Sequence, residues 1–369
     1  MRVAGPILRD RIAGSLYGLL IGDALGCPVE QWSEAQIAAK YGRLTEMEEG
    51  SKRWRPRGLH SDDGQQALAL CDALLVNPHT PEHGFAKLLV DLLQAAPNRR
   101  FGLHRGTGKN FRATVTALAT GCNPHEAGQP SSGNGVAMLI APAAYVWHDD
   151  LDKLCDVVVR IGRVKQKSER GIGAAGAVAF MVRHGLLHGG FQNLREDDLL
   201  ALTRAVESTT SGQLGVPRDA IFSTALARML PSRHGPRADV LAAIAAEASA
   251  SAPYPVGPGA GYAVASVVTA IYLVLSCDSY EAAVTDVVNL GDDADTTGAI
   301  VGAMAGAASG MAGLPERWYA ALVARGALES RIDAVAGSGH NGVRPLVELE
   351  SEWCALEDRP KRGPPTSKR

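Results

Sequence analysis

The segment "NLGDDADTTGAIVGAMAGAASG", residues Asn289 to Gly310, joins a cluster of carboxylates to a long run without charge. Its glycines recur at every fourth position, at 298, 302, 306 and 310. Small residues at this spacing on one helical face let a neighbouring helix approach closely. The run is only mildly hydrophobic, which argues against the alternative of a membrane span. We therefore expect a central, buried helix surrounded by other helices.

The carboxylates at the start of this segment pose an electrostatic problem. A helix N-terminus stabilises one carboxylate, whereas Asp292, Asp293 and Asp295 together repel one another unless a cation neutralises them. A second cluster, Ser61, Asp62 and Asp63, also directly precedes an amphipathic stretch. Either cluster alone fits an ordinary helix cap with an acidic first turn. Together they predict a metal site between two helix starts, and oxygen-only ligands favour Mg²⁺, Mn²⁺ or Ca²⁺.

Composition narrows the fold class and the kind of partner. Of 369 residues, 46% are hydrophobic but only 5% are aromatic, and 41 are glycine, which favours closely packed helices over a β-sandwich. A net charge of −2 argues against general binding to nucleic acids. The six cysteines are widely separated, with no C-x-x-C pair, as in reduced proteins. The N-terminus lacks the layout of a secretory signal. We expect a cytoplasmic, monomeric protein without membrane contact.

Apolar residues recur at helical spacing along most of the chain. The predicted helices include 151–161, 173–184, 197–208, 218–229, 238–250, 262–275 and 280–288. Long loops at 42–60, 97–109, 123–134 and 251–261 are candidates for functional segments. Since alternating strands, repeats and linkers are absent from the pattern, we predict one all-α domain over residues 5–350. The basic, proline-rich residues 358–369 are expected to form a disordered tail.

Four segments resemble, in the same order, the signature segments of the ADP-ribosylglycohydrolase family. They are "GSLYGLLIGDALGCPVE" (14–30), "SDDGQQALAL" (61–70), "GNGVAMLIAP" (133–142) and "NLGDDADTTGAIVGAMAGA" (289–307). The last is the most specific, because D-x-D-T-T-G-A-I before a small-residue helix is hard to obtain by chance. This resemblance implies an all-α, orthogonally packed fold with a binuclear Mg²⁺ site, for which Mn²⁺ could substitute.

The resemblance also implies roles for particular residues. The metal ligands would be Ser61, Asp62, Asp63, Asp293, Asp295 and Thr296. Glu30, a flexible acidic residue of the first segment, would act with Asp63 and Asp293 in catalysis, although a surface carboxylate is the alternative for Glu30. The reaction would be hydrolysis of the bond at the distal ribose of ADP-ribose, in an ADP-ribosylated protein or an ADP-ribose derivative.

Glycine-rich segments are the candidates for holding the diphosphate and the sugar. Backbone amides of "SSGNG" could form an anion-binding nest, and Gly106 lies in a second glycine-rich turn that an ordinary loop would also explain. Tyr262, in "PVGPGAGY", could lie near the adenosine. The predicted substrate-binding residues are Ser132, Gly133, Asn134, Gly135, Met138, Gly106 and Tyr262.

Three departures from the family pattern leave the substrate open. Gly64 stands where Thr is usual, Leu139 where Arg is frequent, and residues 164–169 lack a common T-H dipeptide. Arginine-linked, serine-linked and free derivatives such as O-acetyl-ADP-ribose remain candidates. A binding protein without turnover, or a structural protein like the lens crystallin relatives, is the alternative to an enzyme.

Overall fold

The computed structural model describes residues 5–50, 55–337 and 342–357, and within these ranges the regular structure is helical. The three β-bridges in this part of the chain, Ser33–Gly291, Gln129–Gln166 and Gly133–Tyr262, are isolated pairs that form no strand. The prediction of an all-α fold is confirmed. The basic tail predicted at 358–369 lies outside the described residues.

Eighteen α-helices and three short 3₁₀ helices follow one another along the described chain. Their bounds are α1 Gly5–Gly26, η1 Cys27–Val29, α2 Glu34–Tyr41, α3 Asp62–Val76, α4 Pro81–Gln94, α5 Lys109–Ala119, α6 Pro124–Ala127, α7 Ala141–Val146, α8 Leu151–Lys165, α9 Glu169–His188, α10 Glu196–Leu214, α11 Ile221–Ser232, α12 Arg237–Ser251, α13 Ala263–Ser276, α14 Tyr280–Val288, α15 Ala294–Ser309, η2 Met311–Gly313, α16 Glu316–Tyr319, η3 Val323–Ala327, α17 Leu328–Val335 and α18 Leu346–Glu357.

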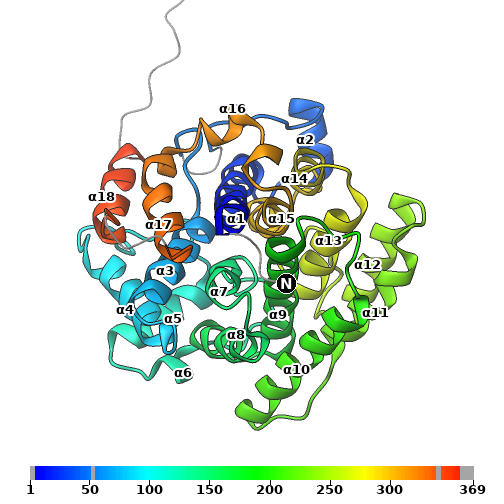
Figure 1. The fold of residues 1–369 in the computed structure, drawn as a ribbon, viewed down its shortest axis with the longest axis horizontal. Helices are drawn as coiled ribbons and strands as arrows, with labels where there is room; N and C mark the ends of the chain where they lie inside the picture. Colours follow the sequence, from blue (N-terminus) through cyan, green and yellow to red (C-terminus); the bar gives the residue numbers. More distant parts are fainter. Residues whose placement is uncertain (1–4, 51–54, 338–341, 358–369) are drawn as a thin grey trace, which may run out of the picture.

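Helix α15 lies at the centre of the molecule, side by side with α1 (Figure 1). The two run antiparallel, because Gly302 of α15 faces Gly18 of α1 and Gly298 faces Gly22. A Cβ atom added at Gly302 would come within 2.1 Å of the Gly18 carbonyl oxygen. The glycine stripe therefore permits backbone contact between these helices, which confirms the predicted central small-residue helix.

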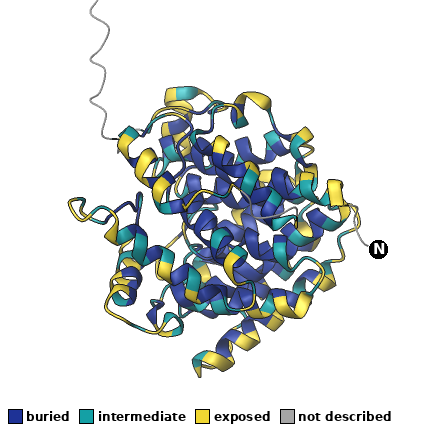
Figure 2. Ribbon diagram, turned by 60° about the vertical axis from the view of Figure 1, so that its left-hand side comes forward, coloured by how far each residue is buried: buried dark blue, intermediate teal, exposed yellow. Residues whose placement is uncertain are grey.

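The other helices surround this pair and expose their outer faces. Figure 2 shows buried residues concentrated on the inner helices, with exposed residues on the outer turns and loops. One apolar core extends from Ile12 in α1 to Cys354 in α18. Residues Gly5–Val29 are apolar and long enough to cross a membrane, but 94% of the most apolar window is buried inside the fold, as in a core helix.

Local signals explain several helix starts, and a local backbone feature corrects one predicted boundary. Serine or aspartate side chains accept hydrogen bonds from first-turn amides at α2, α3, α8, α9 and α14. Helix α11 was predicted to start at Arg218 but starts at Ile221, since Ala220 has a φ of 50° and interrupts helical geometry. The predicted loop 123–134 contains the short helix α6.

Candidate metal-binding active site

The two acidic clusters, far apart in the sequence, line one pocket of about 250 Å³. Ser61 is the N-cap of α3, and Asp62 and Asp63 form its first turn. Asp293 is the N-cap of α15, and Asp295 lies in its first turn. The starts of two helices thus face the same space. The predicted residues that line it are Glu30, Asp62, Asp63, Gly106, Gly133, Asn134, Gly135, Met138, Asp293, Asp295 and Thr296.

Asp23, which the sequence reasoning missed, fixes the start of α3 against α1. Its carboxylate is fully buried and accepts hydrogen bonds from the amides of Ser61 (2.8 and 2.9 Å) and Gly64 (2.8 Å). These are first-turn amides with no partner inside the helix. The sequence offered one signal, a single acid within the apolar stretch "LLIGDALG". Asp23 therefore positions the α3 cluster and adds further negative charge behind it.

Asp63 has one oxygen that the protein itself leaves unpaired. The Ser61 hydroxyl donates to its Oδ2 at 2.8 Å, whereas its buried Oδ1 has no hydrogen-bond partner among the described residues. Burial, followed by the charges of Asp23 and Asp62, raises the pKa of Asp63 well above its usual range. A buried carboxylate with a free oxygen is unfavourable unless a cation or proton satisfies it. This is the arrangement expected of a metal ligand.

The α15 carboxylates show the same electrostatic stress. Burial raises the pKa of Asp295 well above its usual range, and the charges of Asp63 and Glu30 raise it further. Burial also raises the pKa of Asp293 to about 6, although the Asn134 side-chain amide donates to its Oδ2 at 2.7 Å. Since the candidate metal-ligand atoms of the two clusters are all oxygens, the pocket fits a hard divalent cation.

Asp292 lies outside this pocket. Its side chain is exposed and its φ is 55°. Its backbone amide donates to the Trp32 carbonyl, and its carbonyl accepts from the Gln31 amide. Asp292 does not cap the helix either, because the N-cap of α15 is Asp293. Asp292 Oδ2 lies beside Gly257, 3.0 Å from where a Cβ of that residue would be.

Three predicted site residues do not line this pocket: Ser61, Ser132 and Tyr262. Ser61 contributes from behind, through Asp63. The hydroxyl of Ser132 pairs with Ser168, and that of Tyr262 with Ser251 and Arg170. The expected nest of amides is also partly occupied, because the Asn134 amide donates to the Gly261 carbonyl. This bond and the Gly133–Tyr262 bridge fasten the two glycine-rich loops together.

Lys165 and Gln166 line the pocket where the family's T-H dipeptide was missing, and neither was predicted. The Lys165 ammonium donates to the carbonyl of Gly135 at 2.5 Å and to the side chain of Gln66. Burial lowers the pKa of Lys165 to about 8, although the negative charge of Asp62 acts to raise it. The Gln166 amide donates to the Gly133 carbonyl at 2.9 Å. A lysine on the buried side of an amphipathic helix was the available signal.

Arg55 places a second cation behind the carboxylates. Ligand atoms of Asp23, Cys27 and Asp295 lie within 4.8 Å of one another, close enough to share a metal ion. The Arg55 guanidinium, however, lies 2.8 Å from the Cys27 sulfur and is itself buried. Because the protein supplies a fixed positive charge there, this group is less suited to a cation than the pocket side, where Asp62, Asp63, Asp293 and Asp295 lie.

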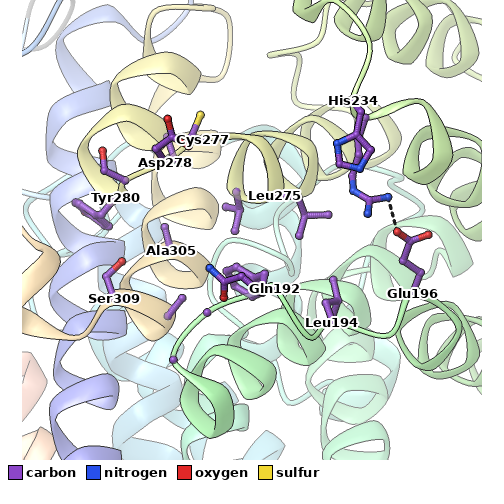
Figure 3. Close-up of a pocket in the computed structure, with 18 residues that line it drawn as sticks. Gln192, Leu194, Glu196, His234, Leu275, Cys277, Asp278, Tyr280, Ala305 and Ser309 are labelled. Atoms are coloured by element: carbon purple, nitrogen blue, oxygen red, sulfur yellow. Dashed lines mark ion pairs between the residues drawn. The ribbon is translucent and has the colours of Figure 1, made fainter.

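A larger cavity, of about 560 Å³, lies at the opposite end of α15 (Figure 3). Ala305 and Ser309 from the last turns of α15 line it, together with Leu275 and Tyr280. Its glutamate, Glu196, is already in an ion pair with Arg233, drawn as the dashed line. The 16-residue helix α15 is about 24 Å long, so this cavity is separate from the carboxylate pocket. It lacks a comparable acidic cluster among the residues that line it.

Comparisons with known proteins agree with this geometry. The family model for ADP-ribosylglycohydrolases matches residues 4–344. The chain is 26% identical over 320 residues to ADP-ribosyl-[dinitrogen reductase] glycohydrolase of Rhodospirillum rubrum, covering 87% of this chain and 92% of the relative. It is 24% identical over 311 residues to ADP-ribosylarginine hydrolase Tri1 of Pseudomonas putida, covering 84% and 73%. A solved ADP-ribosylglycohydrolase-related protein complex superposes with a TM-score of 0.66 at 25% identity, covering 90% of this chain and 98% of the other.

Proposed function

Because the chain belongs to the ADP-ribosylglycohydrolase family, we propose that it is a Mg²⁺-dependent hydrolase acting at the distal ribose of ADP-ribose. The products would be ADP-ribose and a protein side chain or small molecule freed of it. The observation that carries this proposal is the meeting of the α3 and α15 carboxylates in one pocket, with Asp63 Oδ1 left unpartnered.

The donor set supports two hard cations in this pocket. Asp62, Asp63, Asp293 and Asp295 offer carboxylate oxygens, and Thr296 adds a hydroxyl at the pocket wall. Mg²⁺ prefers such ligands and keeps several waters of its own. When bound, the metals would supply Lewis-acid chemistry, holding ribose hydroxyls and acidifying water. Mn²⁺ has the same ligand preference and should substitute.

The chain's own residues provide the remaining parts of the mechanism. Half-buried Glu30 lines the pocket, where its carboxylate would orient the ribose or accept a proton from water. The carboxylates of Asp63 and Asp293 favour the positive charge that develops on the sugar ring as the glycosidic bond breaks. Asn134 holds Asp293 by its 2.7 Å hydrogen bond.

Pocket shape supports a ligand that approaches the protein backbone closely. Gly106 has a φ of 68°, and a Cβ there would lie 2.8 Å from Asp62 Oδ1. A side chain at this position would fill space beside the metal ligands. Lys165 places a positive charge near Asp62, where an anionic part of the substrate could gain from it.

The name of one relative, ADP-ribosylarginine hydrolase, makes an arginine-linked substrate the first to test. Purified protein should be incubated with ADP-ribosylated arginine, ADP-ribosylated serine and O-acetyl-ADP-ribose, each with Mg²⁺, Mn²⁺, Zn²⁺ or EDTA. Release of ADP-ribose from at least one substrate with Mg²⁺ or Mn²⁺, its loss in EDTA and a poor response to Zn²⁺ are the expected results. Full turnover in chelator would overturn the binuclear site. Binding of ADP-ribose without turnover would favour a binding protein. Absence of both binding and turnover would favour a structural role.

A further inference from the structure

A second group of metal-ligating side chains lies away from the carboxylate pocket. Glu82 and His83 belong to the first turn of α4, and His125 belongs to α6. One potential ligand atom from each lies within 4.8 Å of the others. None of the three lines the carboxylate pocket as described, so they need an explanation of their own.

The spacing of these atoms matches a small coordination shell. The Nε2 atoms of His83 and His125 lie 3.6 and 3.7 Å from Glu82 Oε1. Two ligands of a tetrahedral zinc ion, each bound at about 2.0–2.1 Å, are separated by about 3.4 Å. The two Glu82–histidine separations exceed this value by a few tenths of an ångström, and closing the shell around one ion requires a shift of an imidazole. The His83 side chain is 60% exposed and has the freedom to make it.

Buried polar atoms in the group lack partners. Glu82 is 1% exposed, yet its Oε2 has no hydrogen-bond partner among the described residues, and the same holds for Nδ1 of His125. Leaving such a group unsatisfied destabilises the fold, because the group has given up its bonds to water. Structures normally satisfy buried polar atoms, so an unpartnered oxygen on a carboxylate that approaches two imidazoles through its other oxygen indicates a missing ligand.

Arg160 binds only one oxygen of the Glu82 carboxylate. Its Nη2 donates to Glu82 Oε1 at 2.5 Å, and its Nη1 donates to Asp156 and to the His79 carbonyl. Ligating carboxylates are commonly held by a hydrogen bond of this kind from outside the metal shell. The guanidinium therefore fixes the orientation of Glu82. It occupies one lone pair of Oε1, the oxygen that approaches both imidazoles, and leaves the other lone pair of Oε1 and all of Oε2 available.

We propose that Glu82, His83 and His125 form a site for Zn²⁺, with a fourth position open to water. Two imidazoles and one carboxylate suit zinc, whereas the all-oxygen pocket suits Mg²⁺. The ion would join the start of α4 to α6, and the chain continues from α6 to the pocket residues Ser131 and Gly133. Its role would be to fasten that wall segment.

The test measures zinc content and coordination in the tag-free, full-length protein. Wild type, His83→Gln, His125→Gln, Asp295→Asn and the exposed control His234→Gln should be dialysed against buffered Zn²⁺ and analysed for bound metal. Replacing either ligand should remove one equivalent and weaken the affinity at least about tenfold. Asp295→Asn and His234→Gln should retain that equivalent. In wild type, Co²⁺ should give the intense visible absorption of a tetrahedral site.

The variants also cover the outcome in which a substitution harms folding. Glu82 is buried and paired with Arg160, so the exposed His83 is the decisive position. Equal zinc content in wild type and folded His83→Gln would overturn the proposal. Zinc lost only in Asp295→Asn would do so too, because it would assign the ion to the carboxylate pocket.

Discussion

At the scale of single residues, the arrangement of Asp292, Asp293 and Asp295 separates two proposed metal ligands from a neighbouring acid. Asp293 and Asp295 line the pocket, whereas the exposed side chain of Asp292 points toward Gly257. Three adjacent acids of similar chemistry thus have different surroundings. Substitution by Asn removes the charge at nearly constant size, so the three variants are matched controls for one another.

We expect Asp293→Asn and Asp295→Asn to lose bound Mg²⁺ and the Mg²⁺-dependent rise in Tm. A ligand that binds only the native state at 100 times its Kd stabilises it by about 2.7 kcal/mol. Without metal, the same variants should be as stable as wild type or more stable, since burial and like charges raise the pKa of both carboxyls. Asp292→Asn should keep both properties. Thermal melts with and without Mg²⁺ measure this, and a wild-type shift in Asp295→Asn contradicts the assignment.

Glu30→Gln tests a catalytic role apart from metal binding. Loss of a general base or orienting carboxylate should lower kcat by about 100-fold or more, while the metal content stays at the wild-type level. The matched control is Glu34→Gln, because Glu34 is an exposed acid in the first turn of α2. Steady-state kinetics and metal analysis are the measurements. Unchanged kinetics would make Glu30 a surface carboxylate only.

The sequence revealed pocket residues that occur in recognisable groups and missed those that act singly. Asp62–Asp63 and Asp293–Asp295 are conspicuous because paired carboxylates at helix starts are costly without a cation. Asp23 is a single acid in an apolar stretch of α1, and Lys165 is one of several charges on the amphipathic helix α8. Their significance depends on which backbone amides or carboxylates lie opposite. That information is tertiary, so periodicity and composition could not supply it.

At the scale of helices, the α1–α15 contact depends on glycine at each crossing point. Gly302→Ala would place a Cβ within 2.1 Å of the Gly18 carbonyl oxygen, which must push the two backbones apart. Such overpacking costs about 1–3 kcal/mol or more, so we expect a clear fall in the free energy of unfolding. Chemical denaturation measures it.

Gly212→Ala in α10 is the control for this prediction, because an added Cβ there meets nothing within 4 Å. In an open helical position alanine should stabilise by up to about 1 kcal/mol. The two substitutions are chemically identical and should have opposite signs. A Gly302→Ala variant as stable as Gly212→Ala would show that the helices can separate without cost.

The helix pair also marks a limit of sequence interpretation. The stripe in α15 indicated a close neighbour but did not identify it. The glycines at 14, 18, 22 and 26 repeat the same four-residue spacing in α1 and face that stripe in the fold. One periodic stripe predicts that a partner exists. Matching two stripes could have predicted the partner, and their antiparallel register depends on the connections between them.

At the scale of the whole molecule, helix α18 holds two segments of the pocket from outside. Glu350 is completely buried, with Oε1 3.0 Å from His60 Nε2 and Oε2 2.5 Å from Arg105 Nη2. His60 precedes the N-cap Ser61, and Arg105 precedes the pocket residue Gly106. A single carboxylate near the C-terminus thus joins both loops, which no local pattern in the sequence could have indicated.

This carboxylate predicts how stability depends on pH. Burial alone would raise the pKa of Glu350, but the Arg105 charge and the His60 hydrogen bond outweigh it and lower the pKa to about 2 from 4.5. The unfolded chain therefore binds a proton first as the pH falls. The stabilisation is fully present above pH 4.5 and is lost as the pH falls from there toward 2. It amounts to roughly 3 kcal/mol.

Glu350→Gln should therefore lower the free energy of unfolding at pH 7 by about 3 kcal/mol or more, because it leaves Arg105 buried without its counter-charge. Between pH 4.5 and 3, the free energy of unfolding should fall less in this variant than in wild type, because the variant lacks the carboxyl group that takes up the proton. Glu348→Gln, an exposed position on the same helix, should match wild type at both pH values. Urea unfolding at pH 7, 4.5 and 3 gives the comparison. Since both held segments border the carboxylates, Glu350→Gln should also weaken Mg²⁺ binding, and unchanged Mg²⁺ affinity would limit α18 to a stabilising role.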